Sequence, residues 1–217
     1  EFTQIRAGVA AGIVLLSIKH ILDRNSLTFF TLIAIASMFH YSAMVVAPLY
    51  FVPFKKLNLN RKIALAMAVP AGILLSLPQI DFLYDIPIDL IRTKLAVYAE
   101  AESLRDIKIN VFNSFYIMKY ALLYVYIFFS DEIEKHSKYF PIMLQMYAVS
   151  LFSYLSLSFN SAFSLRISEL FGIVEIILLP MLYHATRHKT LAIIGICSIA
   201  FGTLALALFE TKLIQQV

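Results

Sequence analysis

The chain has 217 residues, of which 60% are hydrophobic and only 15% are charged, and its mean hydropathy is +0.80. Soluble domains contain roughly 45–50% apolar and about 25% charged residues, so this composition excludes an ordinary soluble domain. It also excludes a disordered chain, which requires low hydrophobicity, and a disulfide scaffold, because Cys197 is the single cysteine. The net charge is +4, but most basic residues lie in short breaks between apolar runs, which is typical of a membrane protein rather than of a nucleic-acid-binding protein.

The sequence predicts an all-α fold, a polytopic bundle of transmembrane helices that forms a single membrane domain over residues 1–217. About 20 apolar residues cross the hydrocarbon, and a helix satisfies its own backbone there. The chain begins Glu1-Phe2-Thr3, without Met or a recognisable signal peptide, so we expect it to be the C-terminal portion of a longer protein. Five segments are the clearest predicted spans: roughly 63–83, 111–130, 141–158, 166–184 and 190–209.

Three prolines lie inside these spans, at Pro70, Pro78 and Pro180. Proline lacks the backbone N–H that a helix needs and so leaves a carbonyl four residues earlier without its partner. We expect kinks at these positions, with neighbouring helices covering the freed carbonyls.

The distribution of basic residues predicts which breaks face the cytoplasm. The break at 55–62 contains four Lys or Arg residues and no acid, and it is the strongest inside signal in the chain. Alternation then places 131–140 and 185–189 inside, and 159–165 and 84–110 outside. The last of these is the longest hydrophilic stretch, so we expect one longer extracytoplasmic loop there.

The N-terminal quarter allows two arrangements. Residues 7–22 are apolar, and a second apolar run of 28 residues covers 27–54 with an interruption at His40. At about 1.5 Å per residue, this run makes either one long tilted helix or two short half-helices that meet at His40. A single helix would bury His40 in mid-membrane and put Arg6 at the inner side. We prefer the half-helices, which put Arg24 inside, and Arg6 and His40 outside.

Ionisable residues in the spans are functional candidates, since a central charge costs roughly 2.5–3.5 kcal/mol. Arg166 opens its predicted span, and Glu169 follows on the same helix face. The two form either an interfacial helix-entry pair or a site in which the planar guanidinium of Arg166 binds an anionic group such as a phosphate. Lys119 and Glu175 are predicted at equal depth as an intramembrane ion pair, with a structural or a functional role.

A tyrosine stripe recurs every four residues in the span at 111–130, at Tyr116, Tyr120 and Tyr124. It indicates either aromatic packing between helices or a wetted wall that offers rings and hydroxyls to sugars. No metal-binding spacing of His, Cys or carboxylates and no phosphate-binding glycine loop is present in the sequence. We therefore predict no metal site and no cofactor.

Two motifs carry a family resemblance. The first is Thr3-Gln4-Ile5-Arg6-Ala7-Gly8, followed by an apolar helix and then by Phe39-His40-Tyr41-Ser42-Ala43; the second is Phe163-Ser164-Leu165-Arg166-Ile167-Ser168-Glu169. Over 3–54 and 159–184 the chain resembles the EpsG family of bacterial polysaccharide polymerases, which shows an Arg-bearing entry, a Phe-His-aromatic-Ser-Ala turn and a second Arg-opened helix. Ala7 departs from the family, which often has Gln after the first Arg.

The resemblance implies a Wzy-type polymerase of O-antigen, capsule or exopolysaccharide, a multi-pass protein of the bacterial inner membrane. Such an enzyme transfers oligosaccharide units carried on undecaprenyl diphosphate, at the outer face and without a metal. Its implied partners are the lipid-linked oligosaccharide, membrane lipid, a chain-length regulator and a flippase, and no nucleic acid.

The resemblance also suggests roles for individual residues. Arg6 and Arg166 are expected to bind the diphosphate and to stabilise the charge that develops as it leaves. His40 is expected to act as a base or to position the attacking hydroxyl, and Glu169 to orient Arg166. Three further residues are candidates for substrate binding: Gln4, Tyr116 and Lys119.

Two other functions remain open at this point. A flippase for lipid-linked sugars would use the same arginines without chemistry, although inverted repeats would then be expected and the sequence has none. A membrane acyltransferase that modifies the polysaccharide would use His40 as its base.

Overall fold

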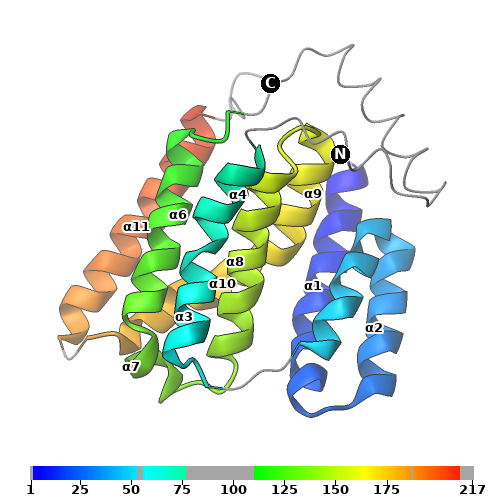
Figure 1. Ribbon diagram of the computed structural model, residues 1–217, viewed down its shortest axis with the longest axis horizontal. Coiled ribbons are helices and arrows are strands. Elements are labelled where there is room, and N and C mark those ends of the chain that lie inside the picture. The colour runs from blue at the N-terminus through cyan, green and yellow to red at the C-terminus, as the bar shows by residue number, and fades with distance from the viewer. Residues whose placement is uncertain (1, 53–55, 77–109, 187, 211–217) are drawn as a thin grey trace.

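The computed structural model describes residues 2–52, 56–76, 110–186 and 188–210, and within these ranges all the regular secondary structure is helical. The helices stand side by side as a bundle (Figure 1). The predicted all-α architecture is therefore confirmed. Among the described residues, three helices are long and apolar enough to cross a membrane by length and composition: Gln4–Leu22, Leu59–Ser76 and Lys189–Leu208. The predicted outer loop at 84–110 lies outside the described residues, except for Asn110.

The N-terminal quarter is a long helix beside two short ones. They are α1 (Phe2–Leu22), α2 (Ser26–Phe39) and the 3-10 helix η1 (Tyr41–Phe51). The 14 residues of α2 and the 11 residues of η1 both rise roughly 21–22 Å, since a 3-10 helix rises about 2.0 Å per residue and an α-helix about 1.5 Å. Neither reaches the roughly 30 Å of a bilayer core. The prediction of paired half-helices that meet at His40 is confirmed.

Two hydrogen bonds between Arg24 and Tyr50 join the end of η1 to the turn between α1 and α2. The Arg24 Nη1 donates to the Tyr50 carbonyl at 3.2 Å, and the Tyr50 hydroxyl donates to the Arg24 carbonyl at 3.0 Å. The end of η1 therefore returns to the level of the turn between α1 and α2, as the paired arrangement requires.

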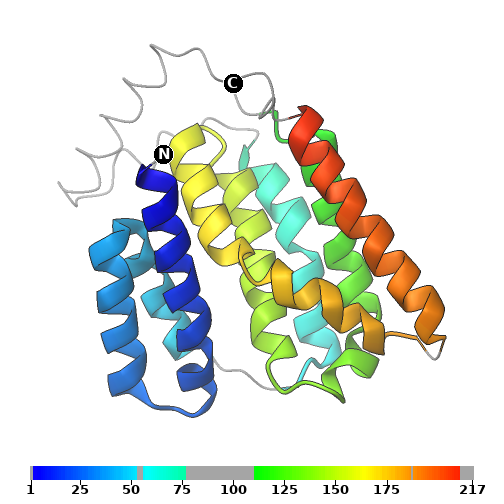
Figure 2. The same ribbon diagram turned by 180° about the vertical axis from the view of Figure 1, so that it is seen from behind.

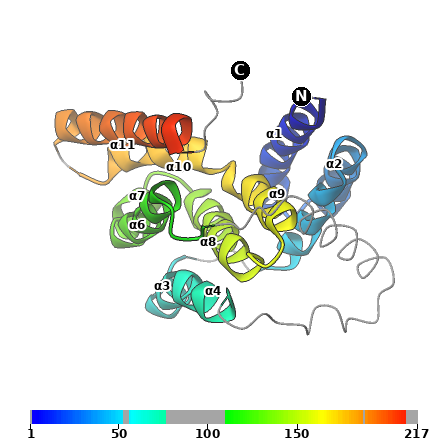
Figure 3. The same cartoon turned by 90° about the horizontal axis from the view of Figure 1, so that it is seen from above.

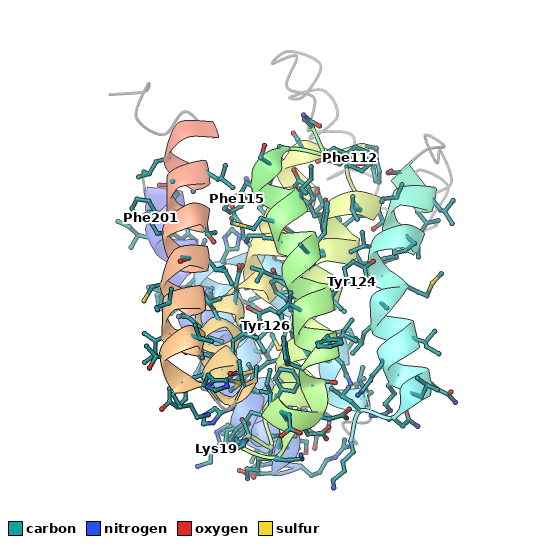
Figure 4. All side chains as sticks on the ribbon, turned by 90° about the vertical axis from the view of Figure 1, so that its left-hand side faces the viewer. Lys19, Phe112, Phe115, Tyr124, Tyr126 and Phe201 are labelled. Atoms are coloured by element: carbon teal, nitrogen blue, oxygen red, sulfur yellow. The ribbon has the colours of Figure 1, made fainter. Side chains whose placement is uncertain are left out.

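The loops that were predicted to face the cytoplasm gather at this same end of the bundle. The Lys62 ammonium lies 2.7 Å from the Asp131 carboxylate, and the rings of His136 and His184 stack with their centroids 4.3 Å apart. We call this the inner end and the opposite one the outer end; Figure 4 shows Lys19 near the inner end and Phe112 near the outer end.

The centre of the larger group of helices is α8 (Phe140–Ser156), in which 13 of 17 residues are buried. Such a helix is surrounded by protein on all sides. Figure 3 shows it between its neighbours, with α1 and α2 set apart beyond α9. The remaining elements of this group are α3 (Leu59–Ala66), α4 (Ala68–Ser76), α6 (Ser114–Phe128), α7 (Ser130–Glu134), α9 (Ser161–Gly172), α10 (Glu175–Met181), η3 (Leu182–His184) and α11 (Lys189–Glu210).

Small residues allow α4 and α9 to approach α8 closely. A Cβ on Gly72 would lie 2.8 Å from the Leu155 Cβ, and one on Gly172 would lie 2.9 Å from the Ser150 Oγ. The Ser150 hydroxyl also donates to the Ser168 carbonyl of α9 at 2.6 Å. Close backbone packing and interhelical hydrogen bonds of this kind hold helices together where lipid removes the hydrophobic drive.

Pro70 explains the interruption between α3 and α4 at Met67. Its missing N–H would have bonded the Ala66 carbonyl, and the Tyr124 hydroxyl of α6 donates to that carbonyl at 3.2 Å. The expected cover of a freed carbonyl by a neighbouring helix is confirmed here. Pro180 lies inside α10, and Pro78 lies outside the described residues.

The prediction of one helix opening at Arg166 and running over 166–184 is wrong. The Asn160 side chain accepts the Phe163 N–H at 3.1 Å, and this cap starts α9 at Ser161. The helix ends at Gly172, where the tight contact with α8 accompanies a change of direction into α10 (Figure 2). Arg166 is consequently the sixth residue of its helix, about 8 Å from the first one along the axis.

Candidate functional site

Arg6 connects α1 to the turn between the half-helices. Its Nε donates to the Phe39 carbonyl at 3.0 Å, at the last residue of α2. This bond uses one of the five guanidinium N–H donors, and the other four point from the two terminal nitrogens. Arg6 can therefore hold the turn and present a fork to an anion at the same time.

His40 lies in that turn, between α2 and η1, in an extended conformation. Its backbone is satisfied, because its N–H donates to the Ala36 carbonyl at 2.9 Å and its carbonyl accepts the Ala43 N–H at 2.9 Å. Burial and then the positive charges of Arg166 and Arg6 lower the pKa of His40 below its usual value of 6.5. The imidazole is therefore neutral at neutral pH and able to accept a proton.

The charges of both arginines lie within electrostatic range of His40. Arg6 belongs to α1 and Arg166 to α9, 160 residues later in the sequence, yet both charges act on one imidazole. The structure thus brings together the three residues that the family motifs singled out. Both arginines are exposed residues.

Glu169 lies on α9 one turn after Arg166, and it is exposed. Residues three apart on a helix are neighbours. The positive charges of Lys119 and Arg166 both act on the Glu169 carboxylate. The orienting role of Glu169 stays a prediction, and Lys119 of α6, a predicted substrate-binding residue, lies within electrostatic range of this carboxylate.

The predicted ion pair between Lys119 and Glu175 is confirmed. The ammonium lies 2.9 Å from the Glu175 Oε2, and the two side chains are only 18% and 15% exposed. The ammonium also lies over the Phe115 ring, 4.7 Å from its centroid. Lys119 is the sixth residue of α6, about 8 Å along the axis from the first one, which is the same distance at which Arg166 lies in α9.

The tyrosine stripe is largely engaged in packing. The Tyr116 ring is 8% exposed and stacks on Tyr154 with centroids 3.3 Å apart, while its hydroxyl lies 3.1 Å from the Ser168 Oγ. Tyr120 is buried and donates to the Val111 carbonyl at 2.9 Å. These contacts agree with the interpretation as interhelical packing, and the role of Tyr116 in substrate binding stays a prediction.

Gln4 is exposed on α1, two residues before Arg6. Two residues correspond to about 200° around an α-helix, so the two side chains leave α1 in nearly opposite directions. The structure does not bring Gln4 to the cluster of Arg6, His40 and Arg166. Within the described ranges, no group of three or more His, Cys, Asp or Glu side chains is placed to hold a metal ion.

Sequence reasoning missed one contributor to the site, the Phe39 carbonyl, and one packing residue, Ser168. A backbone carbonyl leaves no signal in a sequence. Ser168 does leave one, because Ser161, Ser164 and Ser168 recur at helical spacing along α9. Ser164 and Ser168 are both buried against α8 or α6, so this spacing marked the face on which α9 packs.

The fold and the site define an all-helical membrane protein in which charged residues from α1, α6 and α9 and the histidine of the α2–η1 turn gather toward the outer end of the bundle. The chain belongs to the EpsG family, whose model matches residues 1–215. EpsG is a family of Wzy-type polymerases, and membership supports a polysaccharide-polymerase role in general. No curated protein and no solved structure matches the chain in the corresponding comparisons.

Proposed function

We propose that this protein polymerises undecaprenyl-diphosphate-linked oligosaccharide repeat units into O-antigen, capsule or exopolysaccharide at the outer face of the bacterial inner membrane. The reaction is a glycosyl transfer. The bond between the anomeric carbon of the donor unit and the diphosphate breaks, and a bond to a hydroxyl oxygen of the acceptor unit forms. The products are a longer glycan on one lipid and a free undecaprenyl diphosphate.

Arg6 and Arg166 bind the diphosphate from two sides in this proposal. A guanidinium stays charged and grips phosphate oxygens in two places, and preorganised charges are most valuable where negative charge develops on the leaving group. His40 accepts the proton of the attacking hydroxyl, for which a neutral imidazole is required. Glu169 orients Arg166, and Lys119 acts in the same substrate region.

The observation that carries the proposal is the contact of Arg6 with the turn at His40, where its Nε donates to the Phe39 carbonyl at 3.0 Å, together with the charges of Arg6 and Arg166 that both act on His40. Two guanidinium groups and a neutral imidazole within electrostatic range of one another match the two needs of the reaction, an anion site and a proton acceptor. A flippase would need the arginines but has no use for a base.

The test is the substitution Arg166→Lys, which keeps the charge and removes the fork. We expect cells that carry only this variant to make shorter and less abundant polymer, while single repeat units still reach the final acceptor. Polymer length and amount are read from gels of the extracted glycan. Arg61→Lys, at the inner end of α3, is the matched control and should leave the polymer unchanged.

The rival functions give different outcomes in a strain that lacks the protein. Loss of all units, single ones included, would identify a flippase. Polymer of normal length that lacks an ester in mass analysis would identify an acyltransferase. An Arg166→Lys strain with polymer of unaltered length and amount would refute the assigned site.

A further inference from the structure

The Lys119–Glu175 pair is placed at the bend between α9 and α10. Glu169 lies in α9 and Glu175 is the first residue of α10. In one continuous helix, six residues would separate these carboxylates by about 9 Å along the axis and about 120° around it. The Lys119 ammonium contacts Glu175 directly at 2.9 Å. It also lies 5.7 Å from the centroid of the Tyr116 ring, whose hydroxyl is 3.1 Å from the Oγ of Ser168, the residue before Glu169, and its charge acts on the Glu169 carboxylate.

Lys119 itself is held firmly at this position. Its ammonium lies between the Glu175 carboxylate at 2.9 Å and the Phe115 ring at 4.7 Å. The Tyr147 hydroxyl of α8 donates to its backbone carbonyl at 3.2 Å. A lysine side chain is flexible, so these contacts fix a charge that would otherwise sample many positions.

Stability alone is a weak reason for such a pair. Removing two charges from water costs several kcal/mol per ion, and replacing a buried pair by apolar residues is often neutral or stabilising. Inside a membrane bundle, ionisable residues are functional candidates by default. The pair should therefore affect a third group, and Glu169 is the one on which the Lys119 charge acts.

We propose that Lys119 is a positioning residue for Glu169, and that Glu175 holds the Lys119 ammonium where it can act; this inference rests on the proposed polymerase function. The charges alternate in sign from Arg166 to Glu169, Lys119 and Glu175. The Glu169 carboxylate interacts with both Lys119 and Arg166, so its negative charge is partly compensated by Lys119. Glu169 can then orient the Arg166 guanidinium without neutralising it, and the guanidinium keeps its positive charge for the diphosphate of the lipid-linked donor.

An exchange of the two charges tests this role. Lys119→Glu alone places two acidic side chains together, and we expect it to lower the thermal stability of the purified full chain in nanodiscs. Adding Glu175→Lys restores a pair and with it the stability. The exchanged pair nevertheless puts a negative charge near Glu169. We therefore expect the polymerisation rate on the lipid-linked repeat unit to stay lower than that of the native protein, on the order of 10- to 100-fold, as for a misplaced catalytic group.

Two further variants complete the experiment. Lys119→Arg keeps a cation near Glu169 and should restore most of the rate. Exchanging the Lys62–Asp131 pair at the inner end, as Lys62→Asp with Asp131→Lys, is the matched control and should change neither stability nor rate. If the Lys119/Glu175 exchange restores the rate together with the stability, the pair is only structural and the inference is wrong.

A neutral pair keeps the test decisive if the exchanged protein does not fold. Lys119→Met with Glu175→Gln removes both charges at similar volume, and we expect a folded protein with a reduced rate and little change in KM. A normal rate in this variant would overturn the positioning role. Arg166→Lys is measured in the same assay. If Arg166→Lys and the neutral pair both have a normal rate, the proposed function fails. If Arg166→Lys is slow and the neutral pair has a normal rate, only the positioning role is refuted.

Discussion

Arg6→Lys tests two roles of this residue together, its observed contact with the turn before His40 and its proposed binding of the diphosphate. In the native protein the Nε donor holds the Phe39 carbonyl at 3.0 Å, and the terminal nitrogens are available for the diphosphate. A lysine keeps the positive charge but has one nitrogen for both tasks. We therefore expect the variant to lose one contact, either with the turn before His40 or with the ligand.

The size of the effect follows from the energy of one such contact. A hydrogen bond that involves a charged group contributes about 1.5–3 kcal/mol. Since every 1.4 kcal/mol is a factor of ten, loss of one contact in the transition state lowers kcat/KM roughly 10- to 150-fold. Complete removal of the charge, in Arg6→Gln, should cost more than Arg6→Lys because the electrostatic contribution is then also lost.

The assay is the rate at which the purified protein in nanodiscs extends lipid-linked repeat units, counted as rungs of a glycan ladder over time. Arg24→Lys is a closely matched control. Arg24 also donates from an arginine side chain to a backbone carbonyl, that of Tyr50 at 3.2 Å, but at the inner end of the same helices. We expect Arg24→Lys to keep its rate within about twofold. Equal rates for Arg6→Lys and Arg24→Lys would refute the assignment of Arg6 to the site.

Two further predictions concern the base and the packing. If His40 must be neutral to accept a proton, the acid limb of the kcat/KM profile lies below pH 6.5, because burial and the two arginines lower the pKa of His40. Arg166→Gln removes one cation and should move this acid limb to higher pH. An acid limb that stays at the same pH would contradict the role of His40. Gly72→Ala puts a Cβ 2.8 Å from the Leu155 Cβ and should cost about 1–3 kcal/mol, seen as a lower Tm, whereas Gly195→Ala, which meets nothing within 4 Å, should not lower it.

Apolar length and charge placement were sufficient to predict most of the architecture. The half-helices around His40 were predictable because 28 apolar residues with a polar interruption are too long for one simple span and long enough for two short elements. The Lys119–Glu175 pair was predictable because two opposite charges at equal depth in apolar helices have few other ways to be satisfied.

The start of α9 and its break before α10 were not predictable in the same way. An asparagine cap at residue 160 looks like any polar loop residue in the sequence, and its effect depends on one hydrogen bond to the Phe163 N–H. The break follows Gly172, whose close contact with Ser150 is a tertiary feature. The cap decides how far along its helix Arg166 lies, so the motif was visible in the sequence and its position in the helix was not.

The turn at His40 gives a physical reason why an arginine stands at position 6. Irregular backbone within a membrane bundle is tolerated only where its polar groups find partners or line a polar cavity. The His40 N–H and carbonyl are satisfied within the turn, and the Phe39 carbonyl, just beyond the reach of the α2 hydrogen-bond ladder, receives the Arg6 Nε. The Arg6 guanidinium thus stabilises the turn that carries His40. After burial and the charge of Arg166, the charge of Arg6 also lowers the pKa of His40. In the proposed function, one side chain therefore couples the anion site to the neutral base, an arrangement that a glycosyl transfer from a diphosphate needs and that simple transport does not.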